Sequence, residues 1–119
     1  MNCRRTLPWV ASLDRRYKSR GLQVVGLHSP EFDEEKEPEL VRRGVGVLGI
    51  TYPVVLDNDL KMWDALGNSY WPTLYLLDRT GKIRSVHVGE VHEGDREARD
   101  FERALEAVLA ERAPAAAGR

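Results

Sequence analysis

The single cysteine is the residue best suited to chemistry in this chain. Cys3 opens a helical pattern, because apolar residues recur every three or four positions after it, at Leu7, Val10, Leu13 and Tyr17. The first turn of a helix stabilises a thiolate through the positive end of the helix dipole. Arg4 and Arg5 add positive charge beside it. The position therefore favours a reactive thiol, although many lone cysteines are inert apolar residues.

A second stretch with chemical interest surrounds Pro72. Residues 74–77 are apolar and predict a buried strand, and a proline fits just before a strand, where no ladder N–H is needed. An aromatic residue before proline favours the cis isomer, so the Trp71–Pro72 peptide is predicted to be cis. The alternative is that Pro72 only marks a turn into the strand.

The remaining candidates for metal or disulfide chemistry are weak. His87 and His92 are five residues apart, which is no recognised metal-ligand spacing, and we interpret both as structural. One cysteine excludes a disulfide within this chain and a zinc site made of four cysteines. We therefore expect neither a metal nor a cofactor.

The elements that must position these residues alternate between helix and strand, which predicts an α/β fold. Pro8 lies inside the first helix and should bend it. Glycine-containing residues 78–82 separate two strand patterns and indicate a hairpin. In order, we expect a helix over 4–19, a strand over 22–27, a helix over about 38–45, an extended segment over 52–56, a helix over 60–66, strands over 74–78 and 83–88, and a helix over 95–110.

Length and composition limit the class of protein. A chain of 119 residues with 42% hydrophobic and 31% charged residues is typical of one ordinary globular domain. Its 18 basic and 19 acidic side chains give a net charge of −1, which provides no reason to expect nucleic acid as a partner. The sequence contains neither an apolar run of about 18 residues nor a signal-peptide pattern. These features leave the cellular location unknown.

Cys3 with a proline five residues later, followed by strand, helix and an aromatic–Pro–Thr strand entry, resembles the thioredoxin-like superfamily. The similarity is greatest to the TlpA/ResA branch, including the thioredoxin-like domains of DipZ-type proteins. It covers nearly the whole chain, in the family's order, through residues 2–3, 26–32, 52–57, 70–73 and 78–83.

The resemblance implies a thioredoxin-like sandwich over residues 1–112, with 113–119 as a disordered tail. It also implies a departure, because family members carry Cys-x-x-Cys preceded by a central strand. If Cys3 is the second cysteine, the first would lie one residue before Met1. This chain is then expected to lack the first central strand, and to fold marginally by itself because unpaired buried backbone groups are costly.

By the same resemblance, the function is thiol–disulfide exchange, and Cys3 is the resolving cysteine. Glu31 would handle protons beside the cysteine pair. Pro72 would lie opposite the pair, with Trp71 beside it against the substrate, and Trp9 would add an apolar rim. The expected partners are a protein disulfide or thiol substrate and an electron-donor protein. Relatives are often extracytoplasmic and tethered to a membrane.

Several alternatives stay open. A thiol or selenol peroxidase of the peroxiredoxin or glutathione-peroxidase kind shares the fold, and a non-catalytic thioredoxin-like binding module is compatible with one cysteine. With one thiol, this chain is expected not to turn over as an internal dithiol. By the resemblance, the residue before Met1 in the intact form is expected to be cysteine or selenocysteine. An arbitrary truncation, a decayed gene or an in-frame UGA read as a stop would each explain the start.

Overall fold

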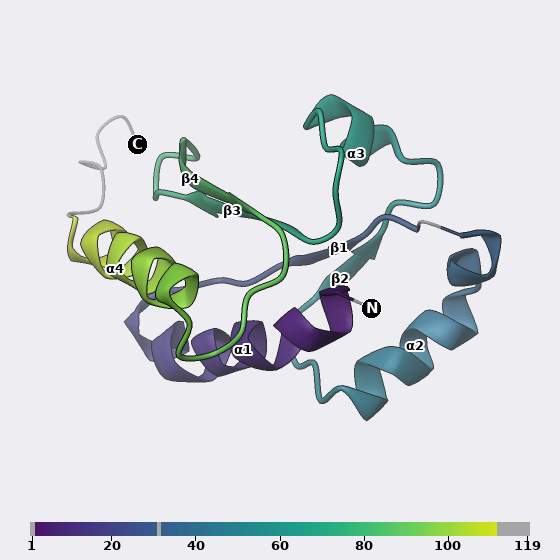
Figure 1. Ribbon diagram of the computed structural model, residues 1–119, viewed down its shortest axis with the longest axis horizontal. Helices are drawn as coiled ribbons and strands as arrows, with labels where there is room; N and C mark the ends of the chain where they lie inside the picture. The colour runs from purple at the N-terminus through teal and green to yellow at the C-terminus, as the bar shows by residue number, and fades with distance from the viewer. Residues whose placement is uncertain (1, 31, 112–119) are drawn as a thin grey trace, which may run out of the picture. The chain divides into compact units, whose positions relative to one another are not determined.

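The computed structural model describes residues 2–30 and 32–111, which form two compact units. We call residues 1–9 with 70–119 the hairpin unit, and residues 10–69 the parallel unit. Helix α1 (Asn2–Tyr17) supplies its first residues to the hairpin unit and its later residues to the parallel unit (Figure 1). Pro8 lies inside this helix, and Arg15 and Arg16 in the last turn complement the negative end of its dipole. The helix predicted from the apolar spacing is confirmed.

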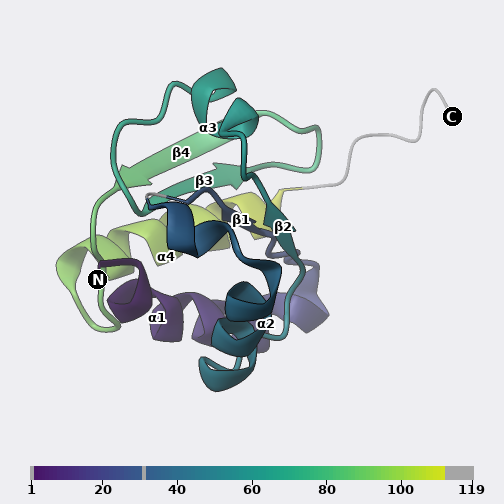
Figure 2. The same cartoon turned by 90° about the vertical axis from the view of Figure 1, so that its right-hand side faces the viewer.

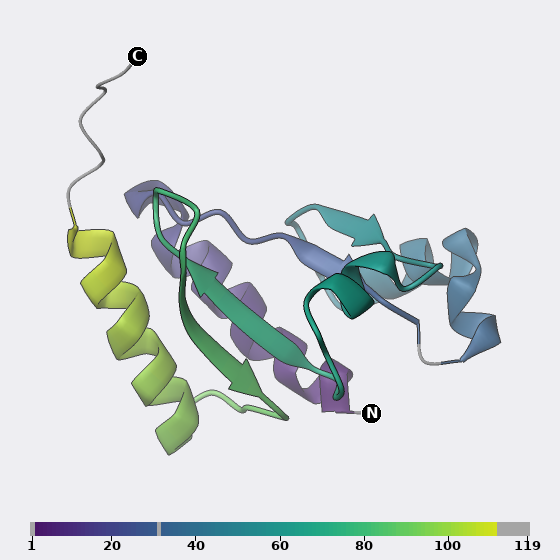
Figure 3. The same cartoon turned by 90° about the horizontal axis from the view of Figure 1, so that it is seen from above.

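The hairpin unit takes its name from strands β3 (Thr73–Leu77) and β4 (Ile83–Val88), which pair antiparallel as predicted (Figure 3). Thr73 pairs with Val88, and the register shifts between Leu76 and Leu77. The Trp71–Pro72 peptide bond that leads into β3 is cis.

Helix α4 (Arg96–Ala110) lies along this hairpin and contacts β4 (Figures 1 and 3). The Asp95 carboxylate just before it accepts a hydrogen bond from the His92 N–H at 2.9 Å. Its buried residues recur at helical spacing along one face, and they are Ala98, Phe101, Leu105 and Val108. The apolar face of α4 is thus the main source of core in this unit.

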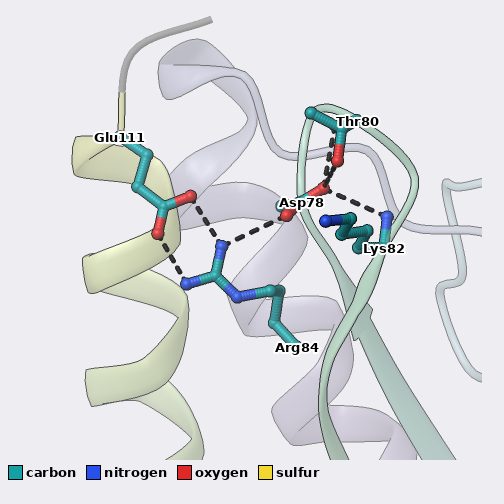
Figure 4. A network of polar contacts seen from close by, with 5 residues as sticks. All are labelled: Asp78, Thr80, Lys82, Arg84 and Glu111. Carbon is teal, nitrogen blue, oxygen red and sulfur yellow. Dashed lines mark hydrogen bonds and ion pairs between the residues drawn. The ribbon is translucent and has the colours of Figure 1, made fainter. Parts of the chain in front are cut away.

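A polar network joins the tip of the hairpin to the end of α4 (Figure 4). Asp78 accepts hydrogen bonds from the hydroxyl and N–H of Thr80, the N–H of Lys82 and the guanidinium of Arg84. Arg84 also donates two hydrogen bonds of 2.7 Å to Glu111. The Thr80 hydroxyl first, then the backbone N–H groups and Arg84, hold the pKa of Asp78 far below its usual range despite partial burial. The folded protein therefore contains Asp78, Arg84 and Glu111 in their charged forms.

Over its described residues, the parallel unit contains a two-stranded parallel sheet (Figure 2) and four short helices, the first of which is η1 (Lys18–Arg20). Gly26 pairs with Val54 in the sheet, where a methyl group on Gly26 would lie only 3.2 Å from the Tyr52 ring. The bounds are β1 (Gly26–His28), η2 (Asp33–Lys36), α2 (Pro38–Val47), β2 (Val54–Leu56) and α3 (Lys61–Ala65).

The predicted strand over residues 22–27 is shorter in the structure. Only Gly26 and Leu27 of that range lie in β1, and residues 22–25 pair with no strand among the described residues. A strand requires a partner along its length, and β2 offers three residues. The described residues therefore form two separate two-stranded sheets. The α/β class is confirmed.

Hydrogen bonds to buried acids organise much of the parallel unit. Asp57 is buried and accepts hydrogen bonds from the Ser29 hydroxyl at 2.8 Å and from the N–H groups of Met62 and Trp63. Burial alone raises the pKa of Asp57, but these hydrogen bonds together outweigh it and lower the pKa. Asp57 therefore anchors the start of α3 to the end of β1 as a carboxylate.

Helices α2 and α3 of this unit are less well packed than α4. Neither α2 nor α3 contains a buried residue. Residues of α2, β2 and Tyr52 line a cavity of about 260 Å³. Burial raises the pKa of the Tyr52 hydroxyl, and the Asp14 carboxylate raises it further.

Candidate functional site

Cys3 lies in the first turn of α1, as the sequence predicts, but its side chain is not among those described. Arg4 and Arg5 follow it and are exposed to solvent. Thr6 comes next and is only 2% exposed. The first turns of α1 therefore have one face in water and one face against the interior of the hairpin unit.

One short segment, residues 89–91, contacts both α1 and Pro72. The Gly89 N–H donates to the Pro72 carbonyl at 2.9 Å. The Val91 N–H donates to the Thr6 hydroxyl at 3.0 Å. The start of β3 and the first turns of α1 therefore both contact the 89–91 segment. The start of β3 and the start of α1 lie side by side in Figures 1, 2 and 3.

Glycine at position 89 is what allows this segment to leave β4 and turn toward α1. Its φ is +107°, a conformation that side chains strongly disfavour. Two residues later, Val91 is 1% exposed and anchors the segment in the apolar interior. The sequence thus combines a permissive turn with an apolar anchor.

A carboxylate is the charged centre of this region. Glu90 lies 3.6 Å from the Arg5 guanidinium and 2.5 Å from Nε2 of His92. Because the Arg5 side chain is 64% exposed, its ion pair contributes little to stability. The pair nevertheless places a negative charge close to the first turns of α1.

Trp71 and Pro72 are half-buried, so both keep some surface in contact with solvent. The Thr73 hydroxyl donates to the Tyr70 carbonyl at 2.8 Å and holds the turn into β3. This geometry leaves surface at Trp71 and Pro72 for a bound segment, and their role in substrate binding stays a prediction.

Trp9 is a correction to the sequence analysis, which placed it at a substrate-binding rim. It is 1% exposed, its ring meets Phe101 edge-on at 5.6 Å, and its indole N–H donates to Glu102 at 2.8 Å. Local spacing indicated an apolar position but not the distant α4 that covers it. Trp9 is therefore a core residue of the hairpin unit.

Glu31 lies outside the described residues. His28 belongs to β1 in the parallel unit, where its Nε2 is 2.8 Å from the Glu35 carbonyl oxygen. Within the part of the chain that the structure describes, no three His, Cys, Asp or Glu side chains could together hold a metal ion. None of its helices is long and apolar enough to cross a bilayer.

The residues that the sequence analysis missed are Thr6, Glu90 and Val91. A threonine in a helix and a valine after a strand are ordinary in local sequence. Their contact joins positions 85 residues apart. The only signal was Gly89 directly after a predicted strand, which indicates a turn but not its partner.

The Redoxin family model matches residues 2–105, which include Cys3, Pro72 and the 89–91 segment. The chain belongs to the redoxin family. This match, together with 34% identity over 92 residues to the thiol-disulfide oxidoreductase ResA of Halalkalibacterium halodurans, confirms the TlpA/ResA-like resemblance seen in the sequence.

Relatives of this redoxin chain include larger proteins. It is 44% identical over 90 residues to protein DipZ of Mycobacterium tuberculosis, an alignment that covers 76% of this chain but 13% of DipZ. It is 30% identical over 87 residues to the thiol-disulfide oxidoreductase YkuV of Bacillus subtilis, covering 73% of this chain and 58% of YkuV. The chain thus spans a small part of DipZ and somewhat over half of YkuV.

Solved structures confirm the thioredoxin-like fold. A thioredoxin-like protein in its oxidised form superposes with a TM-score of 0.77 at 28% identity, covering 91% of this chain and 69% of that protein. A thiol-disulfide isomerase from Corynebacterium glutamicum gives a TM-score of 0.71 at 27% identity, covering 89% and 70%.

Proposed function

We propose that this redoxin chain performs thiol–disulfide exchange with protein substrates, and that Cys3 carries the chemistry. The observation that supports this most is the match to the redoxin family. Cys3 also lies in the first turn of α1, and α1 and Pro72 both form hydrogen bonds with the 89–91 segment. The relative YkuV, a thiol-disulfide oxidoreductase, also supports it.

In this proposal Cys3 is the resolving thiol of a pair, and its partner is a cysteine or selenocysteine three positions earlier. The partner attacks a substrate disulfide, whose S–S bond breaks with release of one substrate sulfur as a thiolate, and a mixed disulfide or selenenyl sulfide forms with the other sulfur. The Cys3 thiolate then attacks the partner atom, forms the internal bond and releases the substrate sulfur as a thiolate. Two electrons pass to the substrate, and an electron-donor protein restores the pair. Glu31 would handle the Cys3 proton.

Pro72 is proposed to lie within contact distance of Cys3, with Trp71 beside it, so that an extended substrate segment passes over both. Family members use backbone next to a proline in this way, and the half-buried state of both residues leaves surface for it. A membrane-tethered intact form is also part of this proposal, and it rests on the family resemblance alone.

The first test is to read the genomic frame immediately before the Met1 codon. A strand-coding stretch that ends in UGC or UGU supports a cysteine pair, and one that ends in UGA supports selenocysteine. A frame with none of these codons there contradicts the paired mechanism.

The second test compares insulin-disulfide reduction by this chain, by the chain extended with the upstream residues, and by the extended Cys3→Ser variant. We expect reduction above the dithiothreitol background from the extended chain alone, because turnover requires two chalcogen atoms. Reduction by this chain itself would contradict the role of Cys3 as resolver. Peroxide consumption that exceeds insulin reduction would instead identify a peroxidase, and substrate binding without either activity would identify a binding module.

A further inference from the structure

The Thr6 hydroxyl is a buried polar group that the proposed reaction does not use. Thr6 is 2% exposed and accepts a hydrogen bond from the Val91 N–H at 3.0 Å. Val91 is itself 1% exposed, so neither group can exchange this hydrogen bond for one with water at no cost. The contact joins the first turns of α1 to the 89–91 segment.

The same segment contacts the entry to β3 through its first residue, where the Gly89 N–H donates to the Pro72 carbonyl. Between these two contacts, Glu90 pairs with Arg5 across 3.6 Å. Because Arg5 is largely exposed, this ion pair is the weaker link to α1. The hydrogen bond of the Thr6 hydroxyl is therefore the stronger link between α1 and the 89–91 segment, which also forms a hydrogen bond with Pro72.

Thr6 follows Cys3 by three residues, which is about one helical turn or about 4.5 Å along the axis. A helix turn moves as a unit, so a displacement of Thr6 displaces the backbone at Cys3. Reaction rates fall steeply when reacting atoms are misplaced by about 1 Å. The position of Thr6 thus matters for any reaction in which the sulfur must meet a substrate held at Pro72.

We propose that Thr6 is a positioning residue: its buried hydroxyl fixes the first turn of α1 to the 89–91 segment, and so sets Cys3 in register with a peptide bound at Trp71 and Pro72. This inference rests on the proposed function. Thr6 acts through the backbone, so its loss should impair attack on a peptide disulfide more than attack on a small disulfide.

The test uses the chain as it exists and two disulfides that release thionitrobenzoate. One is 5,5′-dithiobis(2-nitrobenzoate), and the other is an extended peptide whose cysteine carries thionitrobenzoate. In each reaction the Cys3 thiolate attacks the sulfur bonded to thionitrobenzoate. A new S–S bond forms, the old one breaks, and thionitrobenzoate leaves with the electron pair as a coloured thiolate. The measured quantity is the ratio of the peptide rate constant to the small-disulfide rate constant.

Three variants are compared with the wild type. Thr6→Val keeps the shape but removes the acceptor, and we expect the ratio to fall about tenfold. Thr6→Ser retains the hydroxyl and should restore the ratio. Thr80→Val removes a hydroxyl that donates to Asp78 at the hairpin turn, and it should leave the ratio unchanged. Hydrogen exchange of the Val91 amide should accelerate only in Thr6→Val.

The outcomes separate the two proposals. If wild-type Cys3 shows no preference for the peptide over the small disulfide, compared with a free cysteine peptide, no peptide is held at Trp71 and Pro72 beside Cys3, and that part of the proposed function fails together with the positioning role. If the wild type prefers the peptide and Thr6→Val keeps that preference while its Val91 amide exchanges faster, the positioning role alone is wrong. An equal fall of the ratio in Thr80→Val would also overturn it, because the effect would then be general destabilisation.

Discussion

The two units of this chain are stabilised by different kinds of interior. In the hairpin unit the described buried residues are mainly large and apolar, namely Trp9, Leu76, Val91, Ala98, Phe101, Leu105 and Val108. In the parallel unit, buried polar residues are as prominent as apolar ones, and they include Ser12, Asp14, Ser29 and Asp57. The helix α4 buries a whole stripe, whereas α2 buries none of its residues.

This difference indicates how each unit responds to change. Apolar burial is non-directional and depends on the amount of surface removed from water. The stabilisation that a buried, hydrogen-bonded carboxylate provides depends on its geometry and its ionisation, and it is lost when the charge is removed. The proposed site therefore draws its rigidity from side-chain packing, whereas each unit also contains a carboxylate whose lowered pKa makes stability depend on pH, Asp57 in the parallel unit and Asp78 in the hairpin unit.

The largest expected effect contrasts two tryptophans. Trp9→Ala should lower the free energy of unfolding by about 4 kcal/mol, because it empties a fully buried site in the apolar core. Trp63→Ala, at a half-buried position in the otherwise exposed helix α3, should cost about 2 kcal/mol. Urea unfolding followed by circular dichroism measures both. Equal losses would show that the two units do not differ in packing as described.

The apolar core was largely predictable from the sequence because local periodicity reports burial. The stripe in α4 and the hairpin before it follow from spacing and turn residues alone. The strand over residues 22–27 was overestimated because an apolar run does not state how long its partner is. Trp9 was assigned to a surface because its covering residue, Phe101, lies far away in sequence.

A second effect concerns Asp57 and should be smaller than that of Trp9. The folded pKa of Asp57 is lower than the unfolded value, so its charge stabilises the fold above about pH 4 and this contribution is lost as the pH falls through the folded pKa. Asp57→Asn should therefore destabilise the protein at pH 6, and the gap to the wild type should shrink by pH 3. Urea midpoints across this range measure the gap, and a constant gap would contradict a charge-dependent role.

The smallest effects compare two glycines and should have opposite signs. Gly89→Ala should cost about 1–2 kcal/mol, because a side chain is strained at a φ of +107°. Gly44→Ala, in α2 with open space around it, should stabilise the protein by about 0.5–1 kcal/mol through helix propensity. Thermal unfolding of both variants measures the shifts. A destabilising Gly44→Ala would mean that α2 is packed more tightly than it is here.

The candidate site was predictable only in its parts. Cys3 at a helix start and the proline before β3 are local patterns, and sequence reasoning identified both. The contact of Thr6 with Val91 and the pairing of Glu90 with Arg5 depend on tertiary structure, and no local spacing encodes them. Family resemblance predicted roles for Cys3 and Pro72. It did not predict the 89–91 segment, which contacts both α1 and the entry to β3.

The long sequence separation of these contacts has a consequence for biosynthesis. Thr6 meets Val91 across 85 residues, and Trp9 meets Glu102 across 93. Contacts of such separation form only after a large loop has closed. During translation, Cys3 leaves the ribosome well before residues 91 and 102, so its helix gains these partners only later. Until those residues have emerged, the thiol is exposed to cellular oxidants and other thiols.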